Sequence, residues 1–136
     1  MKDTLNNISQ AMEKTMAQVL GIEVTEITRE RVVATMPVDH RTHQPYGILH
    51  GGASVALAET VASLGGMFLV AESGMLVMGQ EINANHIRSV KSGIVTAIGV
   101  PIHQGASSQV WEIKIYTEDK KLVCISRCTL AVRKAK

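Results

Sequence analysis

One segment of the 136-residue chain constrains its fold more than any other. Residues 51–70, GGASVALAETVASLGGMFLV, are mostly apolar and contain a single charged residue, Glu59. The segment is too long for a typical strand and is rich in alanine, so it predicts a helix at about 51–70. A carboxylate at the centre of a bilayer costs roughly 2.5 kcal/mol or more, so we expect a buried helix of a globular domain and no membrane span.

The remaining pattern favours β-strands. Residues 22–38 are rich in valine, isoleucine and threonine with a polar break at Arg29-Glu30-Arg31, which predicts two strands joined by a turn. Four more strands are expected between turn signals, at about 76–88, 93–102, 109–117 and 122–133. An antiparallel sheet wrapped around the long helix would bury that helix, so the sequence predicts an α+β fold.

The N-terminal part predicts a short amphipathic helix at 4–20, followed by Gly21 as a C-terminal stop. Its apolar positions follow a helical spacing: Leu5, Ile8, Met12, Met16 and Val19. Residues 39–50 hold a proline and a glycine and predict an ordered loop. The length suits one domain, residues 1–136, whose core needs no disulfide or metal.

The two cysteines indicate the redox environment of the protein, and the net charge bears on whether it binds nucleic acid. Cys124 and Cys128 are four residues apart in an expected strand, so their Cα atoms would be about 13 Å apart, beyond the ~7 Å limit for a disulfide. We expect free thiols and, since the N-terminus has no signal-like apolar run, a cytoplasmic protein. A net charge of +2 and four scattered aromatic residues argue against binding to nucleic acid.

Glu59 is the main candidate for chemistry, because a buried carboxylate must be paired, protonated or functional. It lies on a stripe of small residues at helical spacing, namely Gly52, Ala56, Ser63 and Gly66. Such a stripe leaves room for a ligand or for a second helix. Ser63 could bond the carboxylate or its own helix backbone. The alternative is that Glu59 reaches solvent at a helix edge.

The start of the long helix offers a second candidate feature. His50-Gly51-Gly52 places backbone N–H groups without bulky side chains at the positive end of the helix dipole, where they could stabilise an oxyanion. The alternative is that the two glycines only allow a sharp turn into the helix. Gln44 and His50 precede this point and Glu59 follows it, which makes the pattern more specific than two glycines alone.

Helix geometry separates the two candidate features. Gly51 and Glu59 are eight residues apart, or about 12 Å along one helix, too far to act on one carbonyl group. If both act, they come from different chains. A two-fold dimer with antiparallel central helices would bring them together, so joint action of the two residues on one carbonyl group predicts an oligomer.

Other chemistries lack support in the sequence. Ser54 is not within a G-x-S-x-G motif, so a serine hydrolase is not expected. His40, His43 and His50 have no accompanying cluster of ligands beyond Asp39, so we expect surface or capping histidines and no metal. Cys128 lies in a strand pattern without a local histidine and is interpreted as packing.

Three segments resemble the hotdog-fold acyl-CoA thioesterases: MPVDHRTHQPYGILHGGASVALAET (36–60), GQEINANHIRSV (79–90) and PIHQGASSQVWEI (101–113). The sequence is most similar to the 4-hydroxybenzoyl-CoA and 1,4-dihydroxy-2-naphthoyl-CoA thioesterases and to the proofreading thioesterase of enterobactin synthesis. The resemblance covers nearly the whole chain after residue 20. It implies a hotdog fold, an antiparallel sheet wrapped around a central helix.

The resemblance also implies roles for individual residues. Glu59 matches the catalytic carboxylate, as nucleophile or as general base, and Gly51 matches the oxyanion donor. Gln44 and His50 match residues that position the thioester, and Ser63 matches a hydroxyl one turn after the carboxylate. The family dimer sets Gln44, His50 and Gly51 opposite the partner's Glu59, and two dimers commonly form a tetramer.

Coenzyme A is part of the expected substrate, and no separate cofactor is implied. The resemblance assigns its pantetheine and nucleotide to two regions, which supply the residues His86, Arg88, His103, Gly105, Ser107 and Ser108. Several relatives carry an arginine in the second region, whereas this chain reads Gly-Ala-Ser-Ser at 105–108. Backbone N–H groups and hydroxyls could still bind phosphate, but preference for coenzyme A over a carrier protein stays open.

The expected function is therefore hydrolysis of an acyl-CoA thioester, and an aryl-CoA is the leading candidate for the substrate. The alternatives are proofreading of carrier-protein thioesters, a hotdog dehydratase or hydratase, and a non-catalytic protein that binds acyl thioesters. The acyl group is not specified by the sequence. Four residues could line its pocket, although residues at such spacing more often belong to a core: Met67, Phe68, Leu69 and Met75.

Overall fold

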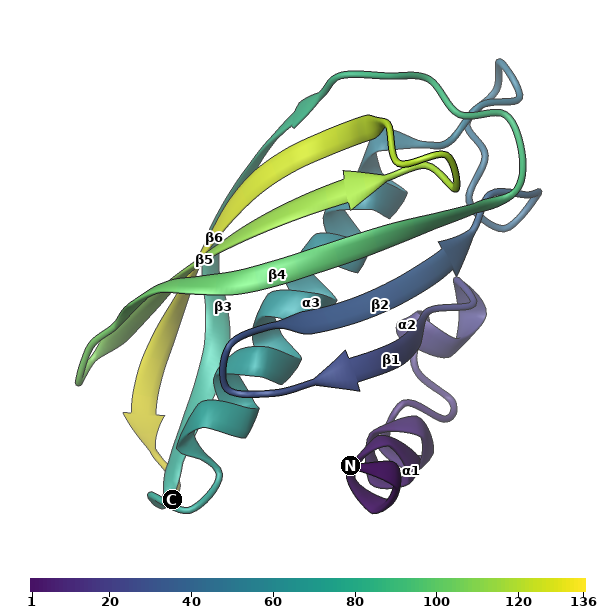
Figure 1. Ribbon diagram of the computed structural model, residues 1–136. Coiled ribbons are helices and arrows are strands. Elements are labelled where there is room, and N and C mark those ends of the chain that lie inside the picture. The colour runs from purple at the N-terminus through teal and green to yellow at the C-terminus, as the bar shows by residue number, and fades with distance from the viewer.

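A long helix lies inside a curved six-stranded antiparallel sheet in the computed structural model, which describes all 136 residues (Figure 1). The helix is α3, Gly51–Val70, as the sequence predicts. The strands are β1 (Glu23–Ile27), β2 (Val32–Pro37), β3 (Met75–His86), β4 (Ile94–Gln104), β5 (Ser108–Tyr116) and β6 (Leu122–Lys134). Their order in the sheet is β1-β2-β4-β5-β6-β3, so β1 and β3 form its two edges. The predicted α+β hotdog architecture is confirmed.

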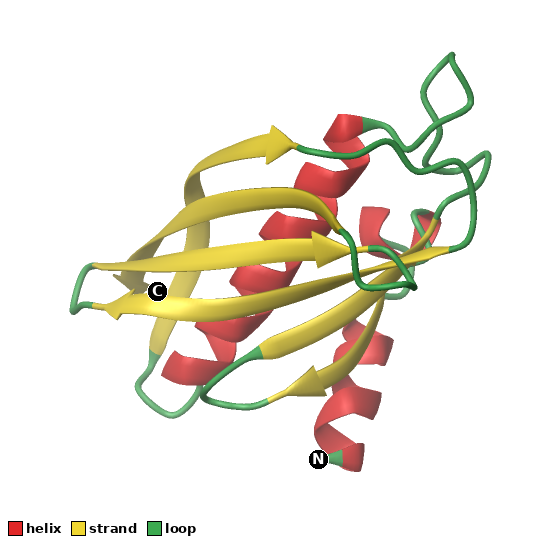
Figure 2. Ribbon diagram, turned by 45° about the horizontal axis from the view of Figure 1, so that its top comes forward, coloured by secondary structure: helices red, strands yellow, loops and turns green.

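The core lies between α3 and the concave face of the sheet (Figure 2). On β5, the buried Trp111, Ile113 and Ile115 alternate with side chains that stay partly exposed, as expected for a sheet with one solvent-exposed face. Trp111 packs directly on Gly65 of α3, where a side chain would collide with its ring. By length and hydropathy alone α3 could cross a membrane, but it packs against all six strands of this sheet.

The N-terminal segment departs from the predicted single helix at 4–20. It forms α1 (Lys2–Ala11) and α2 (Met16–Val19), and Lys14 between them has a left-handed φ of +60°. The Thr15 hydroxyl donates to the Met12 carbonyl at 2.6 Å, and the Lys14 N–H donates to the Gln18 side chain at 2.7 Å. These polar contacts replace the helical hydrogen bonds that the apolar spacing predicted.

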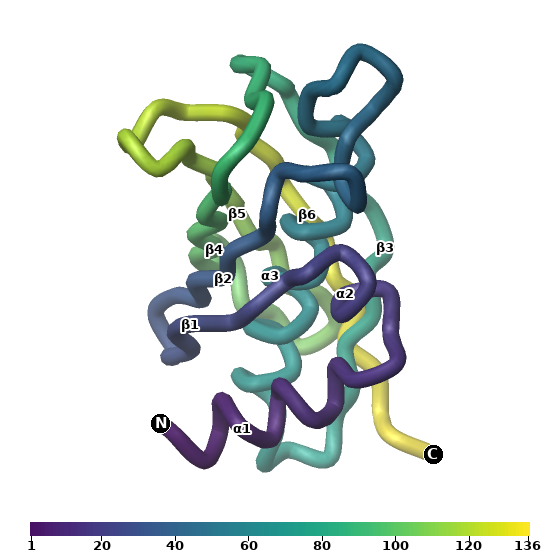
Figure 3. The backbone as a smooth tube through the Cα atoms, turned by 90° about the vertical axis from the view of Figure 1, so that its right-hand side faces the viewer, coloured from purple at the N-terminus to yellow at the C-terminus, as the bar shows by residue number.

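The break also turns the chain, and Figure 3 shows the change of direction between α1 and α2. Leu5, Ile8 and Met12 pack against the core. Met16 and Val19, predicted to continue that stripe, are instead 63% and 66% exposed. The apolar stripe therefore ends at Met12.

Strand β3 is irregular near its middle, and this irregularity positions the site described below. Its pairing with β6 shifts between Gly79 and Glu81, so Gln80 is the extra residue of a β-bulge. Cys124 and Cys128 lie on β6 beside this strand, and both are buried and free. The prediction of free thiols is confirmed.

Candidate active site

Glu59 projects from α3 towards the edge strand β3. Its carboxyl group rests on Gly79, where an added methyl group would lie 3.1 Å from the carboxyl carbon. The side chain is half-buried and takes part in none of the four ion pairs of the chain. The structure thus places an unpaired carboxylate at the rim of the fold, neither deeply buried nor fully in solvent.

The hydroxyl predicted to accompany this carboxylate does not bond it. No hydrogen bond joins Ser63 to Glu59, although Ser63 lies one turn further along α3 and is half-buried. The neighbouring Thr60 bonds its own helix, donating to the Ala56 carbonyl at 2.7 Å. The Glu59 carboxylate is therefore left without a protein donor within this chain.

The N-terminus of α3 leaves one backbone donor unused. His50 is the N-cap, and its Nδ1 accepts a hydrogen bond from the Gly52 N–H at 2.7 Å. The N–H groups of Ala53 and Ser54 donate to the His50 carbonyl at 3.0 and 3.2 Å. The Gly51 N–H donates to no acceptor in the chain, so it is the free donor at the positive end of the helix.

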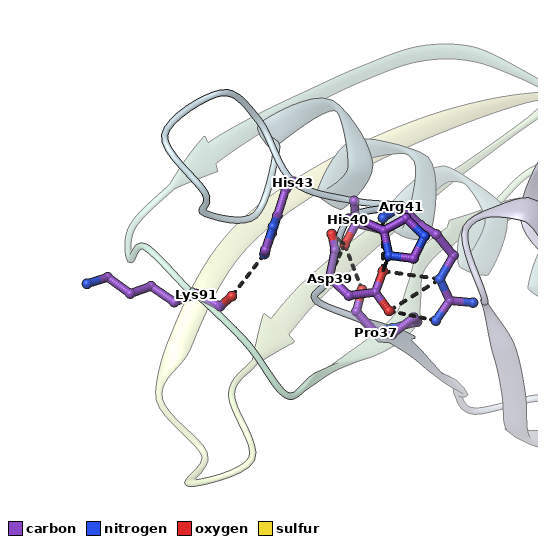
Figure 4. Close-up of polar contacts among 7 residues, drawn as sticks. Pro37, Asp39, His40, Arg41, His43 and Lys91 are labelled. Carbon is purple, nitrogen blue, oxygen red and sulfur yellow. Dashed lines mark hydrogen bonds and ion pairs between the residues drawn. The ribbon is translucent and has the colours of Figure 1, made fainter.

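The loop that leads into α3 is held by several hydrogen bonds, drawn in part in Figure 4. The hydroxyl of the buried Thr42 donates to the Pro37 carbonyl at 2.7 Å. The His43 ring bonds the Lys91 carbonyl at 2.9 Å (Figure 4). The Leu49 N–H donates to the Val90 carbonyl at 2.7 Å. These bonds fix the direction from which the chain enters the helix.

An ion pair stabilises the beginning of the same loop. The Arg41 guanidinium donates to both carboxylate oxygens of Asp39, to Oδ1 at 3.1 Å and to Oδ2 at 2.7 Å (Figure 4). Its hydrogen bonds hold the pKa of the Asp39 carboxyl well below its usual range. His40 is almost fully exposed beside this pair.

Gln44 lies at the base of a tight turn in this loop. Its N–H donates to the Ile48 carbonyl at 2.8 Å, and its carbonyl accepts from the Gly47 N–H at 2.9 Å. The side-chain oxygen accepts from the Tyr46 N–H. The side-chain NH₂ group is the part of Gln44 left to contact a ligand.

His86, the last residue of β3, lies over the start of α3. Its imidazole packs on Gly51, where an added methyl group would lie 2.8 Å from Nε2. Arg88, two residues further on, is exposed and is anchored through its backbone N–H to the Val123 carbonyl at 3.3 Å. Both residues therefore lie at the same end of α3 as the free Gly51 N–H.

The other predicted coenzyme A region lies at the opposite end of the sheet. On β6, Cys124 is the pairing partner of His86 and Ala131 that of Ser108. These two positions are seven residues apart, or about 23 Å along a strand. One chain therefore does not bring residues 103–108 together with His86 and Arg88.

The 103–108 region is a tight hairpin. The Gly105 N–H donates to the Ser108 carbonyl at 2.8 Å, and the His103 ring packs against Gly105. The Ser107 carbonyl accepts from the Arg133 side chain at 3.3 Å. Arg133 therefore supplies a cation at a loop that has no arginine of its own, a contribution the sequence analysis missed because the residue is 26 positions away in the chain.

The candidates for other chemistries, a cysteine nucleophile, a serine nucleophile and a metal site, lack the surroundings that each would need. Burial, together with the charges of Glu59 and Glu81, raises the pKa of the Cys128 thiol to about 12, which leaves it unreactive. Ser54 is buried. No three histidine, cysteine, aspartate or glutamate side chains lie close enough to hold a metal ion.

Most residues considered for the acyl pocket belong to the core. Phe68, Leu69 and Met75 pack against it, and only Met67 is exposed among the four. A different cavity, of about 290 Å³, opens beside the start of α3. Its walls come from α2, the 41–43 segment and α3, with the residues Met16, Leu20, Arg41, Thr42, His43, His50, Gly52, Ala53 and Ala56.

The chain thus carries a free N–H and a cavity at the start of α3 and an unpaired carboxylate further along the same helix, which are the kinds of group that acyl transfer needs. The family described as the thioesterase superfamily matches residues 46–124. The chain is 49% identical to a 1,4-dihydroxy-2-naphthoyl-CoA hydrolase of Listeria monocytogenes over 88% of its length and 96% of that protein. It is 47% identical to the proofreading thioesterase EntH of Cronobacter turicensis over 95% of its length and 93% of that protein.

A solved structure agrees with these sequence comparisons. The thioesterase HI1161 of Haemophilus influenzae superposes with a TM-score of 0.91 at 52% identity, covering 96% of this chain and 90% of that one. The chain belongs to the thioesterase superfamily, and it is a thioester hydrolase. The predicted family and reaction class are confirmed.

Proposed function

We propose that the protein hydrolyses aryl-CoA thioesters at a site shared by two chains, with the Gly51 N–H as oxyanion donor and the partner's Glu59 as catalytic carboxylate. What supports this assignment most is the Gly51 N–H, the one N–H in the first turn of α3 without an acceptor. Such a donor stabilises the charge that develops on a thioester oxygen during attack. Gln44 and His50 lie just before it and can orient the thioester.

The shared site follows from the edge strand β3, which has one side unpaired. Two copies of β3 could pair antiparallel about a two-fold axis at Asn83. The two central helices would then lie on the same face of the joined sheet. That register sets the partner's His86 opposite Gly79 and Gln80, where the bulge adds a residue. Since Glu59 rests on Gly79 and His86 rests on Gly51, Glu59 would face the partner's Gly51.

The same pairing would unite the two coenzyme A regions. Residues 103–108 lie at the end of the sheet where β3 begins, and His86 and Arg88 lie where it ends. Antiparallel pairing of two β3 strands brings one chain's end beside the other chain's beginning. Arg88 of one chain and the loop with Arg133 of the other then supply the cations for the nucleotide phosphates.

Exposed apolar side chains on β3 support further assembly. Leu76 and Met78 face away from α3 and are 42% and 57% exposed. We propose that two dimers join as a tetramer that covers such residues.

Both cysteines are free, which supports a reducing compartment, and we place the protein in the cytoplasm.

An aryl acyl group fits the surroundings of the site better than a long chain. The cavity beside the start of α3 has a volume of about 290 Å³ and apolar walls that include Leu20 and Ala56. The names of two relatives, a dihydroxynaphthoyl-CoA hydrolase and a proofreading thioesterase, support the same class. Proofreading of carrier-protein thioesters is the second candidate, favoured by the absence of an arginine within residues 105–108.

The chemistry begins with polarisation of the thioester carbonyl by the Gly51 N–H. The Glu59 carboxylate then either attacks the carbonyl carbon, giving a mixed anhydride that water opens, or removes a proton from an attacking water. Both routes release the free acid and the thiol. They require a carboxylate that is not engaged in an ion pair, and Glu59 has no ion-pair partner within this chain.

A thiol-release assay tests the proposal. Aryl, short-chain and long-chain acyl-CoAs are compared with the wild type, with Glu59→Ala and with the control Glu72→Ala, which changes an exposed carboxylate after α3. We expect fastest release from an aryl-CoA, loss of turnover in Glu59→Ala with the oligomer intact, and no change in Glu72→Ala. More than a few per cent of activity in Glu59→Ala would exclude the assigned role.

A further inference from the structure

The imidazole of His86 occupies the space beside the oxyanion donor. The three ring atoms nearest to a methyl group built on Gly51 would be Nε2, Cε1 and Cδ2, at 2.8, 3.1 and 3.2 Å. The Nε2 end of the ring therefore points at the first residue of α3. The side chain is exposed in this chain, and in the proposed dimer it would lie at the site that the two chains share.

The geometry of a thioester places a group at this position close to the leaving sulfur atom. The sulfur and the carbonyl oxygen of a thioester are bonded to the same carbon. A group beside the donor that binds the oxygen is therefore also close to the sulfur. Hydrolysis expels that sulfur as a thiolate, which leaves more readily when an acid protonates it.

The other side chains near Gly51 are less suited to this task. The Nδ1 atom of His50 already accepts the Gly52 N–H at 2.7 Å. Arg88 carries a guanidinium, a group that binds anions through its N–H donors and does not serve as a general acid. Glu59 must act as base or nucleophile. His86 is the titratable side chain that remains in contact with Gly51.

We propose that His86 is the general acid that protonates the leaving thiolate, an inference that rests on the proposed thioesterase site. In the general-base route, Glu59 takes a proton from water while the water oxygen bonds the carbonyl carbon. The tetrahedral intermediate then breaks its C–S bond, the electron pair of that bond goes to sulfur, and sulfur takes the proton from Nε2. The proton held by Glu59 returns to His86 through solvent, and the products are the acid and the thiol.

Three thioesters of one aryl acid separate this role from other roles of His86. The first carries coenzyme A, the second carries N-acetylcysteamine, which has the same kind of alkyl thiol without the nucleotide, and the third carries 5-thio-2-nitrobenzoate, an acidic thiol that leaves without protonation. Wild type, His86→Gln and His86→Asn are compared. His40→Gln serves as control, since it changes an exposed histidine outside the site.

We expect the two His86 variants to lose about 10²- to 10⁴-fold in kcat on both alkyl thioesters, the usual contribution of a general acid. On the nitrothiobenzoate ester they should lose less than about tenfold, because that leaving group needs no acid. An equal loss on all three esters indicates a structural role and overturns the proposal. A raised KM for the coenzyme A ester alone, with kcat unchanged, indicates a nucleotide contact and also overturns it. A wild type that cleaves none of the three overturns the proposed function, and this inference with it.

Discussion

The carboxyl group of Glu59 on α3 rests on the backbone of Gly79 on β3, so closely that a methyl group on Gly79 would lie 3.1 Å from its carboxyl carbon. The contact fixes where the carboxylate can sit, because one wall of its space is main chain and cannot move aside. It lies at the bulged edge strand, where a second chain can approach. Gly79 is therefore a positioning residue for the carboxylate.

Substituting Gly79 with valine should displace the Glu59 carboxylate and lower kcat by about 10²-fold, the cost of a displacement near 1 Å. The fold of the single chain should be retained, because Gly79 is exposed on its edge strand β3, and size-exclusion chromatography checks that the oligomer still forms. Kinetics of Gly79→Val are compared in the wild-type and Glu59→Gln backgrounds. If valine acts through Glu59, it adds nothing in the second background; additive losses would contradict this.

The role of the Gly51 N–H can be tested at a position that tolerates proline. Gly51 is the first residue of α3, and His50 before it has an extended backbone with φ −70° and ψ 131°, so Gly51→Pro fits the helix start. Gly51→Ala adds a similar crowding against His86 but keeps the N–H. We expect kcat of Gly51→Pro to fall about 10²- to 10³-fold below that of Gly51→Ala. Equal kcat values would remove Gly51 from the oxyanion site.

Much of the fold could be predicted because its signals are local. The central helix follows from one long apolar segment, and β5 follows from the alternation of Trp111, Ile113 and Ile115 with polar neighbours. Glu59 is identified in the same way, as the single charge within that apolar segment. These features depend on residues that are close together in the sequence.

Features that depend on distant residues could not be predicted. His86 and Gly51 are 35 positions apart, and their contact depends on strand register. The break at Lys14 is a local feature that was also not predicted, because polar contacts of Thr15 and Gln18 outweigh the helical spacing of apolar residues. For Gly79 a signal did exist: a glycine inside a strand pattern often marks a bulge or a close approach of another group.

Arg133 offers a test of the coenzyme A preference. Its side chain contacts the Ser107 carbonyl at 3.3 Å and is exposed, so its contribution to phosphate binding should be near 1 kcal/mol, or about fivefold. Arg133→Gln should raise KM about fivefold for the aryl-CoA and leave KM for the N-acetylcysteamine ester unchanged. Arg29→Gln, in the exposed turn before β2, is the charge-matched control. An unchanged KM for both esters would favour carrier-protein substrates.

The Cys128 thiol should make stability depend on alkaline pH. Its pKa is raised to about 12 in the folded protein, chiefly by burial, whereas in the unfolded chain it titrates near its usual value of about 8.5. The unfolded state therefore loses this proton first as pH rises. The contribution to stability is complete below about pH 8.5 and is lost progressively up to about pH 12.

Urea unfolding measured from pH 8 to pH 10 checks this dependence. The free energy of unfolding of the wild type should fall more steeply with pH than that of Cys128→Ala. Cys124, whose pKa burial also raises, is present in both proteins and does not affect the comparison. Parallel slopes would show that the Cys128 thiol ionises alike in the folded and unfolded chains.

A mixture of two inactive variants tests the shared site directly. Glu59→Gln removes the carboxylate, and Gly51→Pro removes the oxyanion donor. If each site takes one residue from each chain, a mixed dimer has one intact site, formed by Gly51 of the first variant and Glu59 of the second. Random exchange at equal amounts makes about half of the dimers mixed, so activity should return to about a quarter of the wild-type value.

The recovery must depend on subunit exchange, since neither variant alone regains activity. Mixing under conditions that dissociate the oligomer, followed by reassociation, should therefore be required. A double variant that carries both substitutions on one chain is the control: mixed with wild type, its mixed dimers hold no intact site, because each site then lacks either the donor or the carboxylate. Activity that stays at background in the first mixture would place Gly51 and Glu59 in separate functions, since the 12 Å or so between them along one helix prevents joint action within a chain.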